Sequence, residues 1–387
     1  MKKNLFMTAA AIAALLTGCS TDEEIANIET SAKNAIGFNI VSNGAETKAT
    51  IYNNGSTNFD FDVFAFDDSG NYFMGEADEL NFGYLLNEDH SAISKHCGVQ
   101  IYHDGRNWEY KNPSELAYWP AAGSLDFYAV SPTKLDAYQY IGAYTWSIKS
   151  NQRTISYRTT NEFQTNIKDL DVMYAVAKGQ TKNTKNGAVQ LNFKHILSQV
   201  LFKAKVQYES MTVTIKEMKI HNLALGGVFT FPSADVEPTL TNWTSTKTHL
   251  TTTIKNSNTT NVVANSVNTP ADIIGINNPM LVIPQTLTAW DTSISKEDAD
   301  KDENGYQCYL EVGCKIEQNR ATVYDGTLYI PFGTEWLPGK RYTYTLIFGG
   351  GYDDKGKPIL TPITFEPTVE PWVNASGYTE QIPAYKN

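Results

Sequence analysis

LNFKHILSQVLFKAKV, residues 191–206, lies at the middle of a chain of 387 residues. Its apolar residues fall first on odd and then on even positions: Leu191, Phe193 and Leu197, then Val200, Phe202, Ala204 and Val206. Alternation with a period of two predicts a half-buried β-strand. A one-residue change of phase exchanges the two faces of a strand, so we expect a bulge or bend near His195–Ser198. Such a strand could pack against two layers or begin a second domain.

Residues 193–200, FKHILSQV, resemble the F-x-H-x-L-S-x-V signature of the fimbrillin-like pilus subunits and adhesins of Bacteroides-type bacteria. His195 is the residue of this signature whose side chain could act as a metal ligand. No second His, Cys or carboxylate stands near it at the spacing of a metal site, so we expect a strand histidine with a hydrogen-bond partner.

Composition narrows the class of protein. The 22 tyrosines, 17 phenylalanines and 7 tryptophans, with abundant Thr and Asn, favour strands and turns over helices. The formal net charge of −11 and the absence of a basic patch make nucleic-acid binding unexpected. No apolar run of about 18 residues follows the N-terminus, so no internal transmembrane helix is predicted.

The N-terminus has the pattern of an export signal. Lys2 and Lys3 precede an apolar run from Phe6 to Leu16, and Leu16-Thr17-Gly18-Cys19 resembles a bacterial lipobox. We therefore predict a lipoprotein signal peptide over residues 1–18, lipidation of Cys19 and a tether over residues 19–34. The alternative is an ordinary signal peptide with a chance cysteine. The acidic run at residues 22–24 resembles a surface-export signal and fits a solvated linker equally well.

The rest of the chain predicts an all-β protein. Alternating or fully apolar segments recur, as in Phe59–Phe66 and Arg341–Phe348, and no long segment has helical periodicity. Met211–Leu223 shows a second change of phase and predicts another bulged strand. The polar, turn-rich segment Gln180–Gly187 predicts a boundary between two β-sandwich domains, residues 35–185 and 186–387. The last strand, Ile363 to Val369, is broken by prolines, which predicts an edge strand.

The resemblance to the fimbrillin family extends over nearly the whole mature chain. Its markers occur in family order: Tyr118-Trp119-Pro120, Leu125-Asp126-Phe127-Tyr128-Ala129, Ser131-Pro132, Asp171-Val172-Met173-Tyr174-Ala175, Ile283-Pro284-Gln285, Trp336-Leu337-Pro338-Gly339 with Tyr342 and Tyr344, and Val369-Glu370-Pro371-Trp372. The resemblance implies two transthyretin-like (Ig-like) sandwiches in tandem. It also implies a pilus subunit or adhesin for cell adhesion at the outer membrane and cell surface. The partners implied are other pilin subunits and a host or bacterial surface ligand. Whether the subunit is stalk, anchor or tip stays open.

The resemblance also implies assembly by strand exchange. Ile36, Phe38 and Ile40 form one apolar face just before a polar loop, and a trypsin-like protease would cut in that loop and remove the first strand, residues 35–48. The family often has Arg there. This chain has Lys48, the only basic residue between Ala35 and Lys95, so we predict cleavage of the Lys48–Ala49 bond. A donor strand from a neighbouring subunit would refill the groove with the apolar residues of its C-terminal segment: Ile363, Phe365 and Val369.

Signatures of catalysis are missing: there is no G-x-S-x-G, H-E-x-x-H or Walker sequence, so we predict neither an enzyme nor a cofactor. Asp298–Gly305 resembles a calcium loop, but Glu303 and Tyr309 stand where an EF-hand needs Gly and Glu, which favours a solvated acidic loop. An alternative function is a surface lipoprotein that binds carbohydrate through exposed aromatic side chains. The remaining cysteines are expected to be buried free thiols, Cys97, Cys308 and Cys314, although Cys97 could pair with one of the other two if the fold brings them together.

Overall fold

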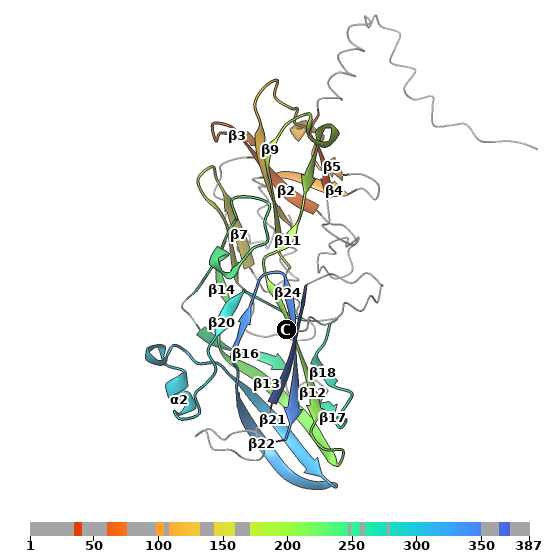
Figure 1. Cartoon of the computed structure of the whole chain (residues 1–387), viewed down its shortest axis with the longest axis vertical. Coiled ribbons are helices and arrows are strands. Elements are labelled where there is room, and N and C mark those ends of the chain that lie inside the picture. The colour runs from red at the N-terminus through yellow and green to blue at the C-terminus, as the bar shows by residue number, and fades with distance from the viewer. Residues whose placement is uncertain are drawn as a thin grey trace, which may run out of the picture.

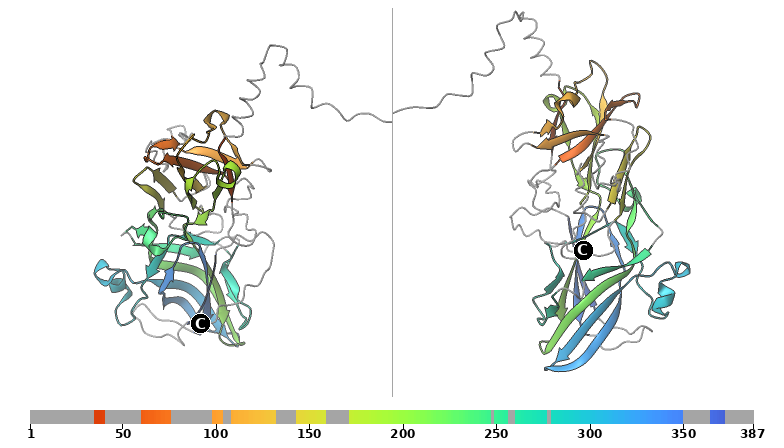
Figure 2. Two further views of the ribbon diagram at one scale, coloured as in Figure 1. Left: turned by 45° about the horizontal axis from the view of Figure 1, so that its top comes forward. Right: turned by 180° about the vertical axis from the view of Figure 1, so that it is seen from behind.

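The computed structural model describes residues 35–40, 60–75, 98–103, 108–131, 143–158, 171–246, 249–255, 260–276, 279–349 and 364–371. Figures 1 and 2 show an elongated molecule with a seven-stranded sheet toward one end and a two-sheet sandwich at the other. We call these regions the upper sheet and the lower sandwich. Nearly all of the described elements are strands, which confirms the predicted all-β fold.

The upper sheet is buried on both faces. Its strand order is β11 (Lys194–His195), β9 (Met173–Gln180), β6 (Leu125–Ser131), β2 (Asp60–Asp67), β4 (Val99–His103) and β5 (Trp108–Tyr110), and β3 (Tyr72–Met74) pairs with β2. In β2, Phe61 and Val63 face one apolar core while Phe64 and Phe66 face another. Both faces of β2 are therefore buried, as in the inner strand of a sheet that is covered on both sides.

The first face of the upper sheet is covered by a two-stranded parallel pair, β1 (Gly37–Ile40) and β10 (Ala188–Leu191). Phe38 and Leu191 join Phe61 and Phe127 in the core between them, which we call the first core. β1 comes from the beginning of the described chain and β10 from its middle. The pairing therefore closes this face with two segments about 150 residues apart in sequence.

The second face is covered by a four-stranded sheet of order β15 (Trp243–Ser245), β14 (Gly226–Thr230), β8 (Arg153–Arg158) and β7 (Ala143–Ile148). The second core lies between the two sheets and contains Tyr174, Phe229 and Leu197. β7 and β8 precede the predicted boundary at residues 185/186, whereas β14 and β15 follow it. The division into two domains at that boundary stays a prediction, and strands pair across it.

The lower sandwich consists of two facing sheets. One has the order β18 (Ala271–Ile274), β12 (Ser198–Val206), β24 (Lys340–Phe348) and β25 (Thr364–Pro371), with β19 (Met280–Val282) paired to β12. The other has the order β16 (His249–Lys255), β13 (Met211–Ala224), β21 (Tyr309–Gln318) and β22 (Ala321–Pro331), with β17 (Val262–Ala264) paired to β13. The third core fills the space between them. The pairing of β13 with β21 shifts between Ile215 and Glu217, which confirms the predicted bulge.

The stretch 191–206 contributes to all three cores. It contains the end of β10, the whole of β11 and all of β12, with a bend at Leu197 between the last two. Leu191 lies in the first core, Leu197 in the second and Val200 in the third. The predicted bend near His195–Ser198 is thus confirmed. The change of phase occurs because the chain passes from one core to the next at this point.

Short elements complete the described chain. Two strands, β20 (Gln285–Leu287) and β23 (Thr334–Trp336), pair with each other. In the part of the chain that the structure describes, helical structure is confined to α2 (Lys296–Ala299) and four 3-10 turns: η1 (Pro113–Glu115), η2 (Thr184–Gly187), η3 (Leu240–Asn242) and η4 (Asp302–Asn304). Within the described ranges no helix has the length and apolar character needed to cross a membrane.

Candidate functional site

β1 is seated in an apolar slot on the upper sheet. Ile36 and Phe38 are buried, and Ile40 packs against the same core. The Phe38 ring stands edge-on to the rings of Phe61 and Phe127, with centroid distances of 6.1 and 6.0 Å. The predicted apolar face at residues 36, 38 and 40 is therefore directed into the protein. That this strand is displaced stays a prediction.

The two sides of the slot hold the backbone of β1. On one side β1 runs parallel to β10, with Phe38 opposite Val189. On the other side the Ile36 N–H donates to the carbonyl oxygen of Ala117 at 2.9 Å, and the Tyr110 hydroxyl donates to the carbonyl oxygen of Ile36 at 2.9 Å. Among the described strands β10 pairs with β1 alone. Removal of β1 would consequently leave the edge of β10 without its ladder.

β25 is the candidate donor strand, and it lies on the edge of its own sheet. It pairs antiparallel with β24, with Phe365 opposite Leu346, and it ends the order of described strands, as its prolines predict. Phe365 is half-buried, and its ring lies 5.6 Å from that of Phe332. Val369 is 58% exposed. Ile363, the third predicted donor residue, lies outside the described residues.

The ion pairs on the outer face of β25 were not predicted from the sequence. Glu366 pairs with Lys205 of β12, and Glu370 pairs with Arg341 of β24. The available signal was the four-residue spacing of the two glutamates, which places both on one face of a strand, together with the outward phase of Lys205. Their partners depend on which strands become neighbours, and the sequence pattern does not supply that information.

Several family-like motifs converge where β12 leaves the bend and enters the lower sandwich. The Ser198 hydroxyl donates to the carbonyl oxygen of Leu337 at 2.9 Å, and the Leu337 N–H donates to the Tyr342 hydroxyl at 2.8 Å. The Gly339 N–H donates to the carbonyl oxygen of Leu197 at 2.9 Å. Gly339 has a φ of 65°, a conformation that glycine adopts at little cost. The turn at residues 336–339 is therefore fastened to the central stretch by hydrogen bonds from both motifs.

Other buried donors and acceptors in this region form hydrogen bonds with polar side chains. Trp336 donates its indole N–H to the Tyr344 hydroxyl at 3.0 Å, and Tyr344 lies 2.6 Å from the Thr334 hydroxyl. Gln285 accepts from the Ala224 N–H at 3.1 Å and donates to the Ala224 carbonyl oxygen at 2.9 Å, as a strand neighbour would. Paired groups of this kind avoid the cost of burying free donors and acceptors. These motif residues thus have a structural role.

His195 has the hydrogen-bond partner that the sequence predicted. Its Nδ1 lies 3.1 and 3.0 Å from the two carboxylate oxygens of Asp171, which is fully buried. His195 belongs to β11 and Asp171 precedes β9, so the contact joins two neighbouring strands of the upper sheet. Among the described residues no group of three or more His, Cys, Asp or Glu side chains is placed to hold a metal ion.

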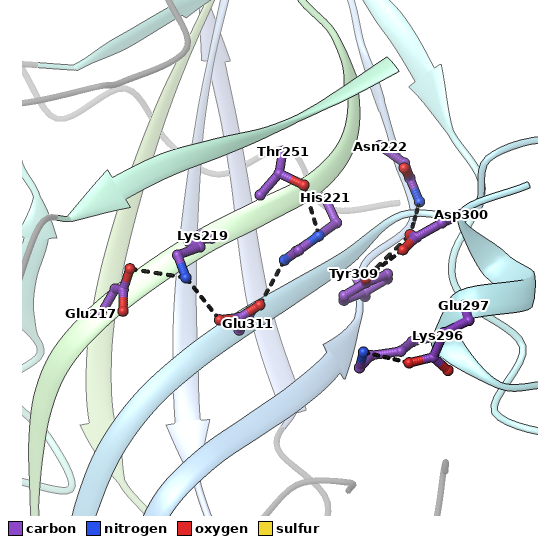
Figure 3. A network of polar contacts seen from close by, with 10 residues as sticks. All are labelled: Glu217, Lys219, His221, Asn222, Thr251, Lys296, Glu297, Asp300, Tyr309 and Glu311. Carbon is purple, nitrogen blue, oxygen red and sulfur yellow. Dashed lines mark hydrogen bonds and ion pairs between the residues drawn. The ribbon is translucent and has the colours of Figure 1, made fainter. Parts of the chain in front are cut away.

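The acidic segment Asp298–Gly305 contains the end of α2 and the whole of η4, so the solvated loop predicted from the sequence is wrong for this segment. Asp298 accepts hydrogen bonds from Ser295 and from Lys301, at 3.0 and 2.6 Å. Asp300 accepts from the Asn222 side-chain amide at 2.7 Å and from the Tyr309 hydroxyl at 3.1 Å (Figure 3). These carboxylates are directed at side chains of the protein.

The same polar network continues along β13 and β21 (Figure 3). His221 stacks on Tyr309 with a centroid distance of 4.3 Å, and its Nε2 lies 2.9 Å from Glu311. Lys219 also donates to Glu311, at 2.9 Å. The contact with His221 and the pair with Lys219 together lower the pKa of Glu311 to about 2, against the opposing effect of burial. The network fixes the α2 segment to the outer face of the sheet.

The aromatic side chains are mostly internal. Of the six tryptophans in the described ranges, five are buried and Trp108 is half-buried. The exposed aromatic side chains among the described residues come from separate places in the chain: Phe73, Tyr118 and Tyr208. No specific observation therefore favours a carbohydrate platform. That the chain is neither an enzyme nor a cofactor-binding protein stays a prediction.

Cys308 and Cys314 are buried free thiols, as predicted. Burial raises the pKa of both thiols, that of Cys314 to about 12. The remaining sequence-predicted positions lie outside the described residues: Cys19, Lys48, Ala49 and Cys97. Lipidation and cleavage at these positions stay predictions.

Comparison with known proteins agrees with the motifs. A family model described as fimbrillin-like matches residues 33–372, while no curated protein matches the chain. A fimbrial protein from Bacteroides vulgatus is similar, with a TM-score of 0.56, 16% identity, and coverage of 88% of this chain and 99% of its own. The tip fimbrial protein Mfa3 from Porphyromonas gingivalis has a TM-score of 0.36 and 9% identity, covering 81% of this chain and 94% of its own. The first similarity shows a shared fold. Because the family model spans most of its length, the chain belongs to the fimbrillin-like family.

Proposed function

We propose that this chain is a subunit or adhesin of a cell-surface fimbrium, and that it assembles by exchange of β1 for a strand of a neighbouring subunit. Membership of the fimbrillin-like family supports the assignment to a fimbrium, as does the similar fold of a protein named as fimbrial. The observation that carries the strand exchange is the seating of β1. Ile36, Phe38 and Ile40, at the beginning of the described chain, fill an apolar slot whose other walls come from distant regions of the chain.

The proposed first step is a cut between Lys48 and Ala49. After that cut β1 is held only by its noncovalent contacts, and its departure opens the slot and frees the edge of β10. Segment 359–369 of another subunit then adds as a strand, with Phe365 and Val369 entering the first core. Val369 is 58% exposed on its own subunit, so it gains burial by moving. The contact is head-to-tail and does not close on itself, so repetition makes a filament.

The free energy gained by burying the donor strand is comparable to the cost of association. About five apolar side chains at roughly 1.5–3 kcal/mol each contribute on the order of 8–15 kcal/mol. Association costs about 4–15 kcal/mol in lost freedom. Backbone hydrogen bonds to β10 and a close fit in the slot must therefore supply the margin, which makes assembly sensitive to single side chains on the donor strand.

The first test is limited trypsin digestion of the native protein, followed by N-terminal sequencing and sizing. We expect a new N-terminus at Ala49 and oligomers in the cut sample alone. The Lys48→Ala variant should resist this cut and stay monomeric. Cutting with no oligomers under any condition would instead assign a tip or a non-polymerising adhesin. An uncut loop would assign an anchor or refute strand exchange.

A matched pair of variants tests the donor strand. Val369→Asp adds a charge to an exposed position, so the free subunit should keep its stability, while burial of that charge in the slot should abolish assembly. Val263→Asp, at an exposed position of β17, is the control and should assemble normally. Equal assembly of the two variants would refute the assignment of β25 as the donor.

The lipid anchor is a separate element of the proposal. Cys19 follows a basic and apolar leader, and lipidation there would hold the protein at the outer membrane. Replacement of Cys19 by alanine should release the protein from the membrane fraction and lower its mass by the acyl groups. A variant that stays membrane-bound with no such difference in mass would refute the anchor while leaving the strand exchange untouched.

A further inference from the structure

The outer face of β25 is bound to the sheet by two carboxylates. Glu366 accepts from the Lys205 ammonium with both oxygens, at 2.8 and 2.7 Å. Glu370 accepts from Nη1 of Arg341 at 3.1 Å. Glu366 stands opposite Thr345 of β24, and Lys205 belongs to the strand on the far side of β24. Lys205 therefore reaches across the middle strand to hold the edge strand.

The two partners in each pair differ in their surroundings. The side chains of Lys205 and Arg341 are 17% and 12% exposed, whereas Glu366 and Glu370 are 57% and 56% exposed. Arg341 is fixed further, because its Nε donates to the side chain of buried Gln199. The cations thus belong to the fixed sheet. The carboxylates move with β25 if the strand leaves.

Little else on the side chains of β25 holds it in place. Phe365 is its one half-buried residue, and the other seven are exposed. Apolar burial, which provides most of the stabilisation of inner strands, is therefore small here. The remaining contacts are the backbone ladder to β24 and the two ion pairs.

We propose that Glu366 and Glu370 form a charge latch with Lys205 and Arg341 that retains β25 on the free subunit, and that salt or loss of the carboxylates releases the strand. The contribution of this release to assembly rests on the strand exchange proposed above. Release leaves two partly buried cations on the β12–β24 face. These two cations match an extended segment whose carboxylates are four residues apart. Glu366 and Glu370 have this spacing, so the latch is specific for β25.

Hydrogen exchange of the uncut, full-length protein, read by mass spectrometry over residues 364–371, tests the latch directly. Exchange of β25 should be about tenfold faster in E366Q/E370Q than in the native protein, the size expected for two modest ion pairs. Raising NaCl from about 50 to about 500 mM should speed exchange in the native protein and have much less effect in the double variant. Native-like exchange in E366Q/E370Q, or an equal salt response, would overturn the proposal.

The same sheet face offers a control. Lys203 of β12 pairs with Asp272 of β18 at 3.2 Å, and Asp272 is 56% exposed. Asp272→Asn removes a carboxylate of matching exposure without touching β25, so exchange at residues 364–371 should not change. The charge swap Lys205→Glu with Glu366→Lys should restore slow exchange relative to either single reversal. A swap no better than the single variants would refute direct pairing.

The latch and the proposed function fail in different ways. The exchange measurement needs neither the cut at Lys48 nor a polymer. If E366Q/E370Q opens faster and, once cut, also polymerises faster than Asp272→Asn, both proposals are supported. If it opens faster and no cut variant polymerises, self-assembly by strand exchange is refuted, the chain is assigned as a tip or a non-polymerising adhesin, and the latch stands. Unchanged exchange refutes the latch whatever the assembly shows.

Discussion

Replacement of Phe38 by alanine is expected to lower the free energy of unfolding by about 3 kcal/mol. Phe38 is 4% exposed, and its ring lies 6.0–6.1 Å from the rings of Phe61, Tyr110 and Phe127. Truncation of a buried phenylalanine costs about 3–5 kcal/mol through lost transfer energy and the cavity left behind. We take the lower end because β1 is short and can shift in its slot.

Urea denaturation of the uncut protein, followed by tryptophan fluorescence, measures this difference. Trp119 lies 5.9 Å from Phe127 in the same core, so it reports on the region. Asn39→Ala on the same strand is the control, since Asn39 is exposed and its loss should change stability by less than about 0.5 kcal/mol. Hydrogen exchange of β10 should also be faster in F38A alone. Equal stability and equal β10 exchange in the two variants would refute the view that β1 completes the first core.

Three further predictions concern the lower sandwich. Tyr344→Phe removes the acceptor of the buried Trp336 indole N–H and should lower the free energy of unfolding by about 1–3 kcal/mol in urea denaturation. Glu311 has a pKa lowered from 4.5 to about 2 by His221, so its stabilisation is complete above about pH 4.5 and is lost as the pH falls toward 2. Glu311→Gln should flatten that region of the stability profile. Arg320 has a φ of 66° in the β21–β22 turn, a left-handed conformation that is costly for arginine and cheap for glycine. Arg320→Gly should therefore raise the free energy of unfolding by about 1 kcal/mol, as measured by thermal unfolding.

The first two of these predictions have a matched control variant, and all three have an outcome that would contradict them. Tyr208→Phe alters an exposed tyrosine, and a loss as large as that of the Tyr344 variant would show that the buried hydroxyl has no special role. Glu209→Gln removes an exposed carboxylate, and an equal change of pH profile would contradict the assignment to Glu311. Asn319 shares the turn with Arg320 at a φ of 51°. A destabilised Arg320→Gly would show that the arginine side chain outweighs the backbone strain.

The strands of this protein were largely predictable because alternation is a local property. The change of phase at residues 191–206 predicted a bend, and the phase change after Ile215 predicted a bulge; both are present. The sequence did not reveal that Leu191, Leu197 and Val200 lie in three different cores. Membership of a core depends on which distant strands become neighbours, and a period of two carries no information about that.

The candidate site was predictable from the sequence to a similar extent: the faces and edges of its strands could be predicted, and their long-range pairings could not. The inward face of β1 follows from alternation, and the edge position of β25 follows from its prolines. The parallel pairing of β1 with β10, and the pairing of β14 with β8, join segments far apart in sequence. The short helix α2 was missed because four helical residues are too few to show a period.

The continuity of residues 188–206 has a mechanical consequence. β10 forms a wall of the β1 slot, and the same backbone runs on into β12, which pairs in parallel with β24 over eight residue pairs. In a filament built by the proposed exchange, tension would enter β12 at its N-terminal end. It would leave β24 at its C-terminal end, toward the donor strand. Two parallel strands pulled from opposite ends are loaded in shear, so their hydrogen bonds resist together and do not break in succession. The subunit would then transmit force between its ends through one covalent backbone and one long strand pair.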